Sequence, residues 1–437
     1  MPGHAILDSK QPDEALAGQL RGLRKLLPGE RWTAQFAPSS RAAATLASHE
    51  QVSCAEQAPK SASWIAYLPA GVRAITPDLS RVLADDAAVL PWPVQASEPS
   101  ISCSGPLRPV GGWIMAPRLH RRLALPPDAD LARVLRAVER TDVDAHWYSG
   151  VLSERRVTPR AVTPTHESRL NPHSRLLAIV PHYRCEAFLP RALASLLQQS
   201  LPPAAIVVID DASGEPPIEI CEQFPGVALY QATERSGPFR LVQSAIRQSL
   251  GFDGYLFQDA DDWSALDRVE RLLQTAERTG AELVGTQEMR VEADGQFHPV
   301  AFPIDVNDMV CRAETPTHPL LHPTSVLARS LFERAGGFAT GMRYSGDTEF
   351  LYRALLVGRI VNVDAFSYYY RQRPESLTNS PDTGLRSHRR LHLLRRLRAR
   401  CEWNLFRQQH GQPISLQPES VLPEVPLRHC TGPSVLA

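Results

Sequence analysis

One apolar run, Leu176-Leu177-Ala178-Ile179-Val180, decides the fold of this chain and ends at Pro181. A continuous run of this length is typical of a strand that is buried on both faces of a sheet. Apolar side chains recur at helical spacing over residues 187–200, and a second buried strand follows at residues 206–209. This strand–helix–strand order predicts a parallel sheet with right-handed crossovers.

Acidic residues follow two strands of the predicted sheet. The strand at residues 206–209 is followed by Asp210-Asp211, and a third strand at residues 254–258 is followed by Asp259-Ala260-Asp261-Asp262. Ligands of parallel sheets bind beyond the carboxyl ends of the strands, so both acidic groups are expected to face one crevice. Clustered carboxylates suit a divalent cation, which usually carries a phosphate. A solvated Asp-rich turn is the alternative.

The bulk composition narrows the class of protein. A chain of 437 residues predicts more than one domain, and its 43% apolar content is sufficient for a globular core. Lys plus Arg equals Asp plus Glu at 47 each, so the charge gives no indication of a nucleic-acid partner. The seven cysteines form no C-x-x-C pair, which favours a reducing compartment. Without a signal-peptide pattern or a membrane-spanning apolar run, we expect a cytoplasmic protein, either free or peripheral on the inner face of the membrane.

Five short motifs lie in a fixed order between Val180 and Thr378. They are Val180–Arg184; Val208–Ser213; Asp259–Asp262; Ala335–Phe338 with Gly346–Phe350; and Tyr369–Arg371 with Ser376–Thr378. In this order they resemble the family 2 glycosyltransferases, inverting enzymes with the GT-A fold. The resemblance implies an α/β fold with a mostly parallel sheet flanked by helices. It also implies transfer of a sugar from a nucleotide-diphosphate donor to a saccharide or lipid-linked acceptor, in bacterial surface polysaccharide or glycoconjugate synthesis.

The resemblance also assigns roles to individual residues. Asp261 becomes the metal ligand for Mn²⁺ or Mg²⁺, with Asp259 on the metal or on the ribose. Asp347 becomes the general base that takes the proton of the acceptor hydroxyl, with Glu349 as the fallback. An Asp347 that only caps a helix is the alternative.

The donor nucleotide is expected to contact a further set of residues. Asp211 is assigned to the nucleobase of the donor. The other members of the set are Pro181, Tyr183, Arg235, Arg240 and Arg373.

Two positions depart from the family pattern. Gly346 stands where the family has a Glu, and Arg373 stands where it often has a metal-binding His. A guanidinium cannot ligate a cation, so Arg373 is expected to contact the diphosphate directly, and metal dependence is left open. A nucleotidyltransferase and a non-catalytic sugar-nucleotide-binding protein are the alternative functions.

The sequence predicts five segments. They are an N-terminal lobe (1–150), a linker (151–174), the GT-A domain (175–384), a basic amphipathic helix (385–410) and a Pro-rich tail (411–437). The helix is interpreted either as docking on an anionic membrane or as packing on the core. Residues 170–410 are expected to fold and bind the donor alone.

The N-terminal lobe repeats the second half of the chain in weakened form. Paired stretches are Trp32–Ser39 with Ile206–Ser213; Tyr67-Leu68 with Tyr255-Leu256; Trp113–Ala116 with Ser325–Ala328; Asp128–Leu131 with Asp347–Phe350; and Val143–Ala145 with Val363–Ala365. Ala37 then stands in the place of Asp211. The fixed order favours a degenerate GT-A-like copy, with coincidence as the alternative.

Overall fold

The computed structural model describes residues 170–307, 319–373, 384 and 387–437. Before residue 170 it describes eight short strands and residues 122–125, 133, 134 and 137. The chain divides into two compact units. The first contains residues 1–156 together with 289–300 and 364–367, and the second contains the remainder.

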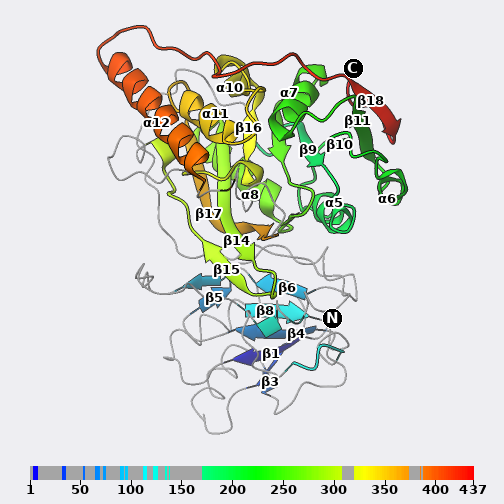
Figure 1. The fold of residues 1–437 in the computed structure, drawn as a ribbon. Coiled ribbons are helices and arrows are strands. Elements are labelled where there is room, and N and C mark those ends of the chain that lie inside the picture. Colours follow the sequence, from blue (N-terminus) through cyan, green and yellow to red (C-terminus); the bar gives the residue numbers. More distant parts are fainter. Residues whose placement is uncertain are drawn as a thin grey trace. The chain divides into compact units, whose positions relative to one another are not determined.

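The first unit contains a six-stranded sheet in the order β3-β2-β1-β4-β8-β6 (Figure 1). Its strands are β1 (Gly3–Leu7), β2 (Trp32–Gln35), β3 (Ser53–Cys54), β4 (Trp64–Leu68), β6 (Val89–Trp92) and β8 (Gly112–Met115). The pairs β3-β2, β2-β1 and β1-β4 are parallel, and the pairs β4-β8 and β8-β6 are antiparallel. A separate antiparallel pair joins β5 (Val72–Ala74) and β7 (Val94–Ala96).

The second sheet has the order β13-β17-β14-β16-β12-β9-β10-β11-β18, with β15 paired to β14. Its first strands are β9 (Leu176–His182), β10 (Ala205–Asp210), β11 (Val227–Ala232) and β12 (Gly254–Phe257). The remaining strands are β13 (Trp263–Ser264), β14 (Leu283–Val291), β15 (Phe297–Val300), β16 (Val326–Ala328), β17 (Ile360–Arg371) and β18 (Leu427–Thr431). Strands β12, β9, β10 and β11 are parallel neighbours, so their carboxyl ends lie along one edge. The parallel sheet predicted from the apolar runs is therefore confirmed.

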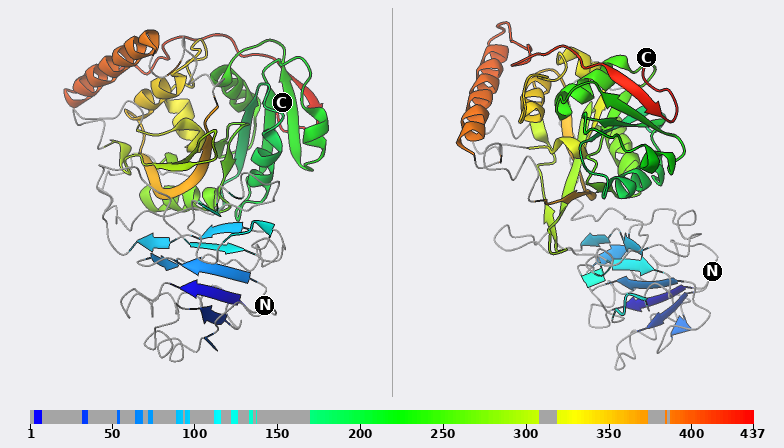
Figure 2. Two further views of the ribbon diagram at one scale, coloured as in Figure 1. Left: turned by 60° about the horizontal axis from the view of Figure 1, so that its bottom comes forward. Right: turned by 45° about the vertical axis from the view of Figure 1, so that its right-hand side comes forward.

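Helices pack around this second sheet (Figures 1 and 2). They are α5 (Leu189–Leu197), α6 (Ile218–Glu222), α7 (Pro238–Gln248), α8 (Arg268–Thr279), η1 (His322–Thr324), α10 (Arg329–Arg334), α11 (Gly346–Ala354) and α12 (His388–Gln409). Figure 2 shows α12 at the outer side of α11, which it contacts. Across the described ranges, none of the helices is both long enough and apolar enough to cross a membrane.

The Pro-rich tail, for which the sequence predicted no structure, is part of the second unit. In Figure 1 it runs from α12 past α10 and α7 and ends in β18, which pairs antiparallel with β11. Its backbone is bound on the way: the N–H of Val425 donates to Ser244 Oγ at 2.9 Å, and the Arg240 guanidinium donates to the carbonyl of Pro423 at 2.7 Å. Val425 is fully buried. These contacts argue against a domain boundary at residue 410.

We expect Val425→Ala to destabilise the second unit and Val421→Ala to leave it unchanged. Val425 is 0% exposed and Val421 is 63% exposed, although both are valines of the same extended tail. Truncation of the buried Val425 side chain is expected to lower the free energy of unfolding by about 1–3 kcal/mol, because apolar burial is lost and a cavity is left behind. Thermal melting of the two full-length variants compares them. Equal melting temperatures would show that the tail is not packed as described.

Candidate active site

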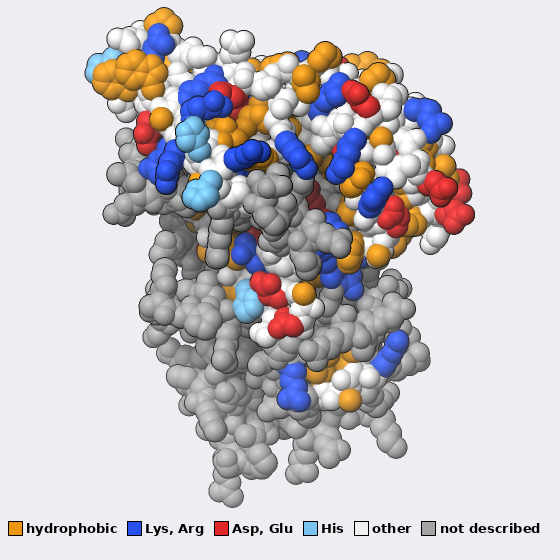
Figure 3. All heavy atoms as spheres, viewed as in Figure 1, with side chains coloured by type: hydrophobic (Ala, Val, Ile, Leu, Met, Phe, Trp, Pro, Cys, Tyr) orange, Lys and Arg blue, Asp and Glu red, His pale blue; other side chains and the backbone are white. Residues whose placement is uncertain are grey.

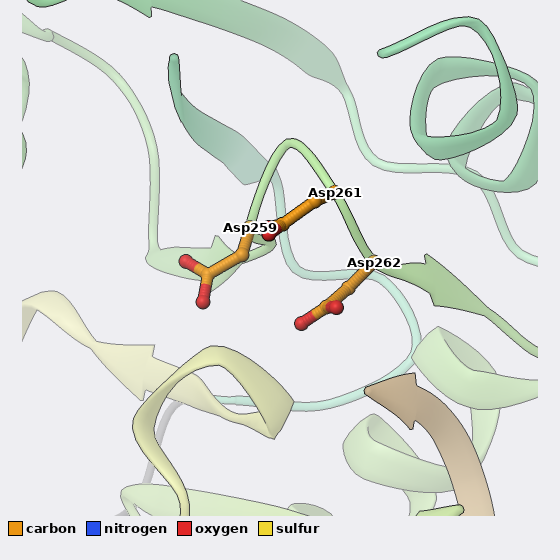
Figure 4. Close-up of side chains that lie close together, drawn as sticks. All are labelled: Asp259, Asp261 and Asp262. Atoms are coloured by element: carbon orange, nitrogen blue, oxygen red, sulfur yellow. The ribbon is translucent and has the colours of Figure 1, made fainter. Parts of the chain in front are cut away.

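Three carboxylates converge on the loop that follows β12. Asp259, Asp261 and Asp262 each present an oxygen within 4.8 Å of the others (Figure 4). Asp262 is buried, whereas Asp259 and Asp261 are partly exposed. The loop begins where the parallel strand β12 ends, as the sequence predicted. The structure therefore brings the acidic cluster together at the edge where ligands of such sheets bind.

Asp262 holds the loop in place. Its carboxylate accepts hydrogen bonds from the Tyr368 hydroxyl at 2.9 Å and from the backbone N–H of Arg371 at 2.7 Å. The Tyr368 hydroxyl in turn accepts from the N–H of Asp259 at 3.1 Å. Because β17 uses both oxygens of Asp262, Asp259 and Asp261 are the two carboxylates that stay partly exposed at this edge of the sheet.

Arg268 supports the loop from inside the protein, and sequence reasoning missed this role. Its guanidinium is fully buried and donates to the carbonyls of Phe257 and Pro323 at 2.8 and 2.7 Å. It also donates to the Gln258 side chain at 2.9 Å. Burial lowers the pKa of Arg268 to about 10, and the nearby Asp262 and Asp259 oppose that change. The only sequence signal for this role was the presence of an arginine shortly after the acidic stretch Asp259–Asp262.

The carboxylates of the cluster repel one another. Burial, with the charges of Asp261 and Asp347, raises the pKa of Asp259 to about 7. Burial, with the charges of Asp261 and Asp259, raises the pKa of Asp262 well above its usual range. A divalent cation would relieve this repulsion, and carboxylate oxygens are ligands that Mn²⁺ and Mg²⁺ accept. The residues present therefore fit such an ion.

Arg373 already pairs with one member of the cluster. Its Nε donates to Asp261 Oδ2 at 2.6 Å, and another guanidinium nitrogen lies 3.4 Å from Cys185 Sγ. Cys185 lies in the loop after β9, so Arg373 joins the ends of two neighbouring strands. The position where the family often has a metal-binding His thus supplies a cation of its own beside Asp261.

Three of the predicted nucleotide residues, Tyr183, Asp211 and Arg235, meet at the ends of β9 and β10. Asp211 accepts hydrogen bonds from the backbone N–H groups of Ser236 and Gly237 at 2.6 and 2.9 Å. These bonds fix the loop before α7, which places the Arg235 guanidinium 4.0 Å from the centre of the Tyr183 ring. The flat Tyr183–Arg235 stack and the Asp211 carboxylate therefore belong to one local structure.

Two other nucleotide-side assignments have structural explanations. Pro181 lies within β9 and pairs in register with Ile209 of β10. Arg240, assigned to the donor from its sequence position, instead pairs with Glu234 at 2.8 Å and binds the tail carbonyl of Pro423. Its guanidinium therefore anchors the tail, and its assignment to the donor stays a prediction.

Asp347 lies in the first turn of α11. The helix begins after Ser345, so Asp347 is not its N-cap. Within the described part of the chain, Asp347 Oδ1 is buried and has no hydrogen-bond partner. The charge of Asp347 raises the pKa of Asp259, so the two carboxylates lie near each other.

The structure explains why a glycine precedes Asp347. A Cβ at Gly346 would lie 2.7 Å from the Phe239 ring of α7, closer than carbon atoms approach. Phe239 therefore fills the space that the family's Glu side chain would need.

Glu349, the fallback base, has a structural role instead. It is buried at 2% exposure and pairs with Arg353, whose guanidinium nitrogens lie 2.9 and 2.5 Å from its two oxygens. It also accepts from the backbone N–H of Glu419 in the tail at 3.0 Å. A carboxylate held this way does not reach an acceptor hydroxyl, so the contacts argue against the fallback assignment.

Two basic residues, His322 and Arg390, lie near Asp347. His322 packs against Phe257, with ring centres 4.1 Å apart, and burial lowers its pKa to about 4, so the imidazole is neutral. Arg390, in the first turn of α12, is buried beside the Tyr344 ring at 5.6 Å. The nearby charge of Asp347 opposes the lowering of the Arg390 pKa by burial. Arg390 of the basic helix α12 is therefore buried in the interior of the second unit.

Comparison with known proteins matches part of the chain to a glycosyltransferase family. The model of the family "Glycosyl transferase family 2" matches residues 177–335. A relative named "Uncharacterized glycosyltransferase EpsJ", from Bacillus subtilis, is 26% identical over 227 residues, covering 46% of this chain and 62% of that protein. "Glycosyltransferase GlyA", from Streptococcus pneumoniae serotype 4, is 30% identical over 128 residues, covering 28% of this chain and 18% of that protein. The S. aureus TarS 1–349 structure in complex with UDP is 21% identical with a TM-score of 0.41, covering 53% of this chain and 66% of that one.

The second unit is thus an α/β domain with a mostly parallel sheet. Residues 177–335 match the model of glycosyltransferase family 2, in agreement with the family inferred from the five motifs, and the expected α/β fold with a mostly parallel sheet is confirmed. The chain spans less than two thirds of the length of each of the two curated relatives described above.

Proposed function

We propose that the second unit transfers a sugar from a nucleoside-diphosphate donor to an acceptor hydroxyl with inversion. The observation that carries this proposal is the Asp347 carboxylate, buried on one side without a hydrogen-bond partner among the described residues. Its charge acts on Asp259 at the end of β12, so it faces the crevice of the acidic cluster. The hydroxyl of an acceptor would supply the hydrogen bond that this carboxylate lacks.

The proposed chemistry follows from these positions. The nucleotide rests against Tyr183 and Arg235 at the ends of β9 and β10, and Arg373 contacts the diphosphate. The acceptor oxygen attacks C1 of the sugar as the bond from C1 to the diphosphate oxygen breaks on the opposite face. Asp347 removes the proton of the attacking hydroxyl during this step. Attack opposite the leaving group inverts the configuration at C1.

Asp259 and Asp261 would hold a divalent cation, Mn²⁺ or Mg²⁺. Such an ion stabilises the negative charge that develops on the departing diphosphate. Arg373 competes for Asp261 in the structure, so binding of the ion requires the guanidinium to give up its 2.6 Å contact. We propose that the released guanidinium then meets the diphosphate, for which its planar fork is well suited.

Release of nucleoside diphosphate from a panel of UDP- and GDP-sugars tests this function. We expect hydrolysis or transfer with one donor class, stimulated by Mn²⁺ or Mg²⁺. Nuclear magnetic resonance of the product should show the inverted anomer. Retention of configuration would contradict the assignment of Asp347.

We further propose that the exposed surface of α12 meets an anionic membrane on which a lipid-linked acceptor sits. Trp403 and Phe406 are 58% and 45% exposed and stack on each other at 5.5 Å. Arg389 and Arg395 are exposed further along the same helix. Figure 3 shows hydrophobic side chains at one end of α12 and basic ones along the rest. Aromatic and basic side chains on one helix are typical of the membrane interface.

We expect the combined change Arg389→Glu, Arg395→Glu and Trp403→Ala to release the protein from anionic vesicles. Each basic residue near such a surface contributes about 1 kcal/mol, and the attraction fades with salt. Hydrolysis of the donor in solution should be unchanged. Arg278→Glu, at an exposed arginine in the last turn of α8, is the matched control. Wild-type protein that ignores anionic vesicles at low salt would contradict the membrane contact.

A further inference from the structure

The sheet of the first unit has the same topology as the catalytic sheet. Its order β3-β2-β1-β4-β8-β6 corresponds strand by strand to β11-β10-β9-β12-β16-β14 of the second unit. In the first unit, three parallel pairs are followed by the antiparallel pairs β4-β8 and β8-β6. In the second unit, three parallel pairs are likewise followed by β12-β16 and β16-β14, both antiparallel.

The strands also follow one another along the chain in the same order. The first connection, residues 8–31, has nearly the length of its counterpart, residues 183–204. The second, residues 36–52, nearly matches residues 211–226. The third is much shorter in the first unit, residues 55–63, than in the second, residues 233–253, where it contains α7. One shortened connection within an otherwise matching series is what a degenerate duplicate would show.

The sequence pairs noted above fall on corresponding strands. The stretch Trp32–Ser39 begins in β2 and its counterpart Ile206–Ser213 begins in β10. Tyr67-Leu68 lies in β4 and Tyr255-Leu256 lies in β12. The sequence pairs therefore occur in the same order along the chain as the corresponding strands. The proposed pairs at Asp128–Leu131 and Val143–Ala145 lie outside the described residues.

The acidic residues that follow β10 and β12 have no counterpart after the corresponding strands β2 and β4. Ala37 follows β2 where Asp211 follows β10. Pro69-Ala70-Gly71 follows β4 where the acidic cluster Asp259–Asp262 follows β12. Both changes fall at the carboxyl ends of parallel strands, where a sheet of this kind binds its ligand. Without these carboxylates the first sheet has neither the anchor for the nucleotide loop nor the ligands for a cation.

We infer that the first unit is a second GT-A sheet that has lost its donor site, and that the chain carries a single nucleotide-sugar site. A chain with two complete sheets could hold two donors and alternate two sugars. This chain adds one kind of sugar, from the second unit. The claim that the chain has one donor site rests on the function proposed for the second unit. The claim that the first unit has no donor site does not depend on that function.

Equilibrium binding of UDP and of GDP to the full chain with Mn²⁺ tests the inference, together with hydrogen exchange. We expect one nucleotide per chain, lost in the Asp259→Asn/Asp261→Asn variant, and slowed exchange only at the ends of β9, β10 and β12. Two nucleotides per chain, binding that survives in the variant, or slowed exchange at residues 36–38 or 69–71 would overturn it. If neither nucleotide binds anywhere, the donor proposed for the second unit is wrong, and the first unit still has no site.

Discussion

Asp347→Asn is expected to lower sugar transfer by ~10²–10⁴-fold, the range typical for loss of a general base. The amide keeps the size of the carboxylate but cannot accept the proton of the acceptor hydroxyl. Nucleotide binding should remain, because Tyr183, Arg235 and the acidic cluster are untouched. The measurement is the transfer rate beside nucleotide affinity, both on the full chain with Mn²⁺.

Glu349→Gln is the matched control for that experiment. It makes the same chemical change two residues further along α11. Two residues turn a helix by about 200°, so the two side chains lie on nearly opposite sides of it. Loss of one partner from the buried Glu349–Arg353 pair should cost about 3–5 kcal/mol of stability. We expect a lower melting temperature for Glu349→Gln and an unchanged one for Asp347→Asn. Near-normal turnover in Asp347→Asn would remove it as the base.

The sequence predicted those parts of the fold that local patterns encode. The apolar runs at residues 176–180 and 206–209 lie within β9 and β10, because a strand buried on both faces must be apolar throughout. The acidic cluster followed from its position directly after β12. Asp347 and Glu349 were both reasonable bases from sequence, since the two-residue spacing does not show which side of α11 faces the crevice.

Other features depend on partners that are distant in sequence. The tail has no apolar period, and its bound backbone groups involve Ser244 and Arg240, far earlier in the chain. Arg268 gave no sign of its role because two of its partners are backbone carbonyls, which every residue carries. The pairing of Arg373 with Asp261 joins residues separated by much of the domain. Such contacts arise from packing, which single-sequence patterns do not encode.

Asp261→Asn is expected to abolish metal-dependent nucleotide binding while the fold remains. The amide oxygen can still accept the hydrogen bond that Arg373 Nε donates to Asp261 at 2.6 Å, so the loop keeps its geometry. The variant loses the negative charge that attracts a cation. Changing a residue that only supports a metal ligand typically lowers metal affinity by about 10–100-fold. Changing a ligand itself should lower it more. Calorimetry with Mn²⁺ and UDP or GDP measures the loss. Unchanged affinity would show that Asp261 serves only as the partner of Arg373.

Arg373→Met separates the two roles of that pair. The variant removes the cation that competes for Asp261, so Mn²⁺ should bind the nucleotide-free protein more tightly than it binds wild type. It also removes the guanidinium proposed to meet the diphosphate, so the nucleotide should bind more weakly in the absence of Mn²⁺. The two affinities are therefore expected to change in opposite directions. A purely structural arginine would weaken both together, because its loss would loosen the acidic loop that both ligands need.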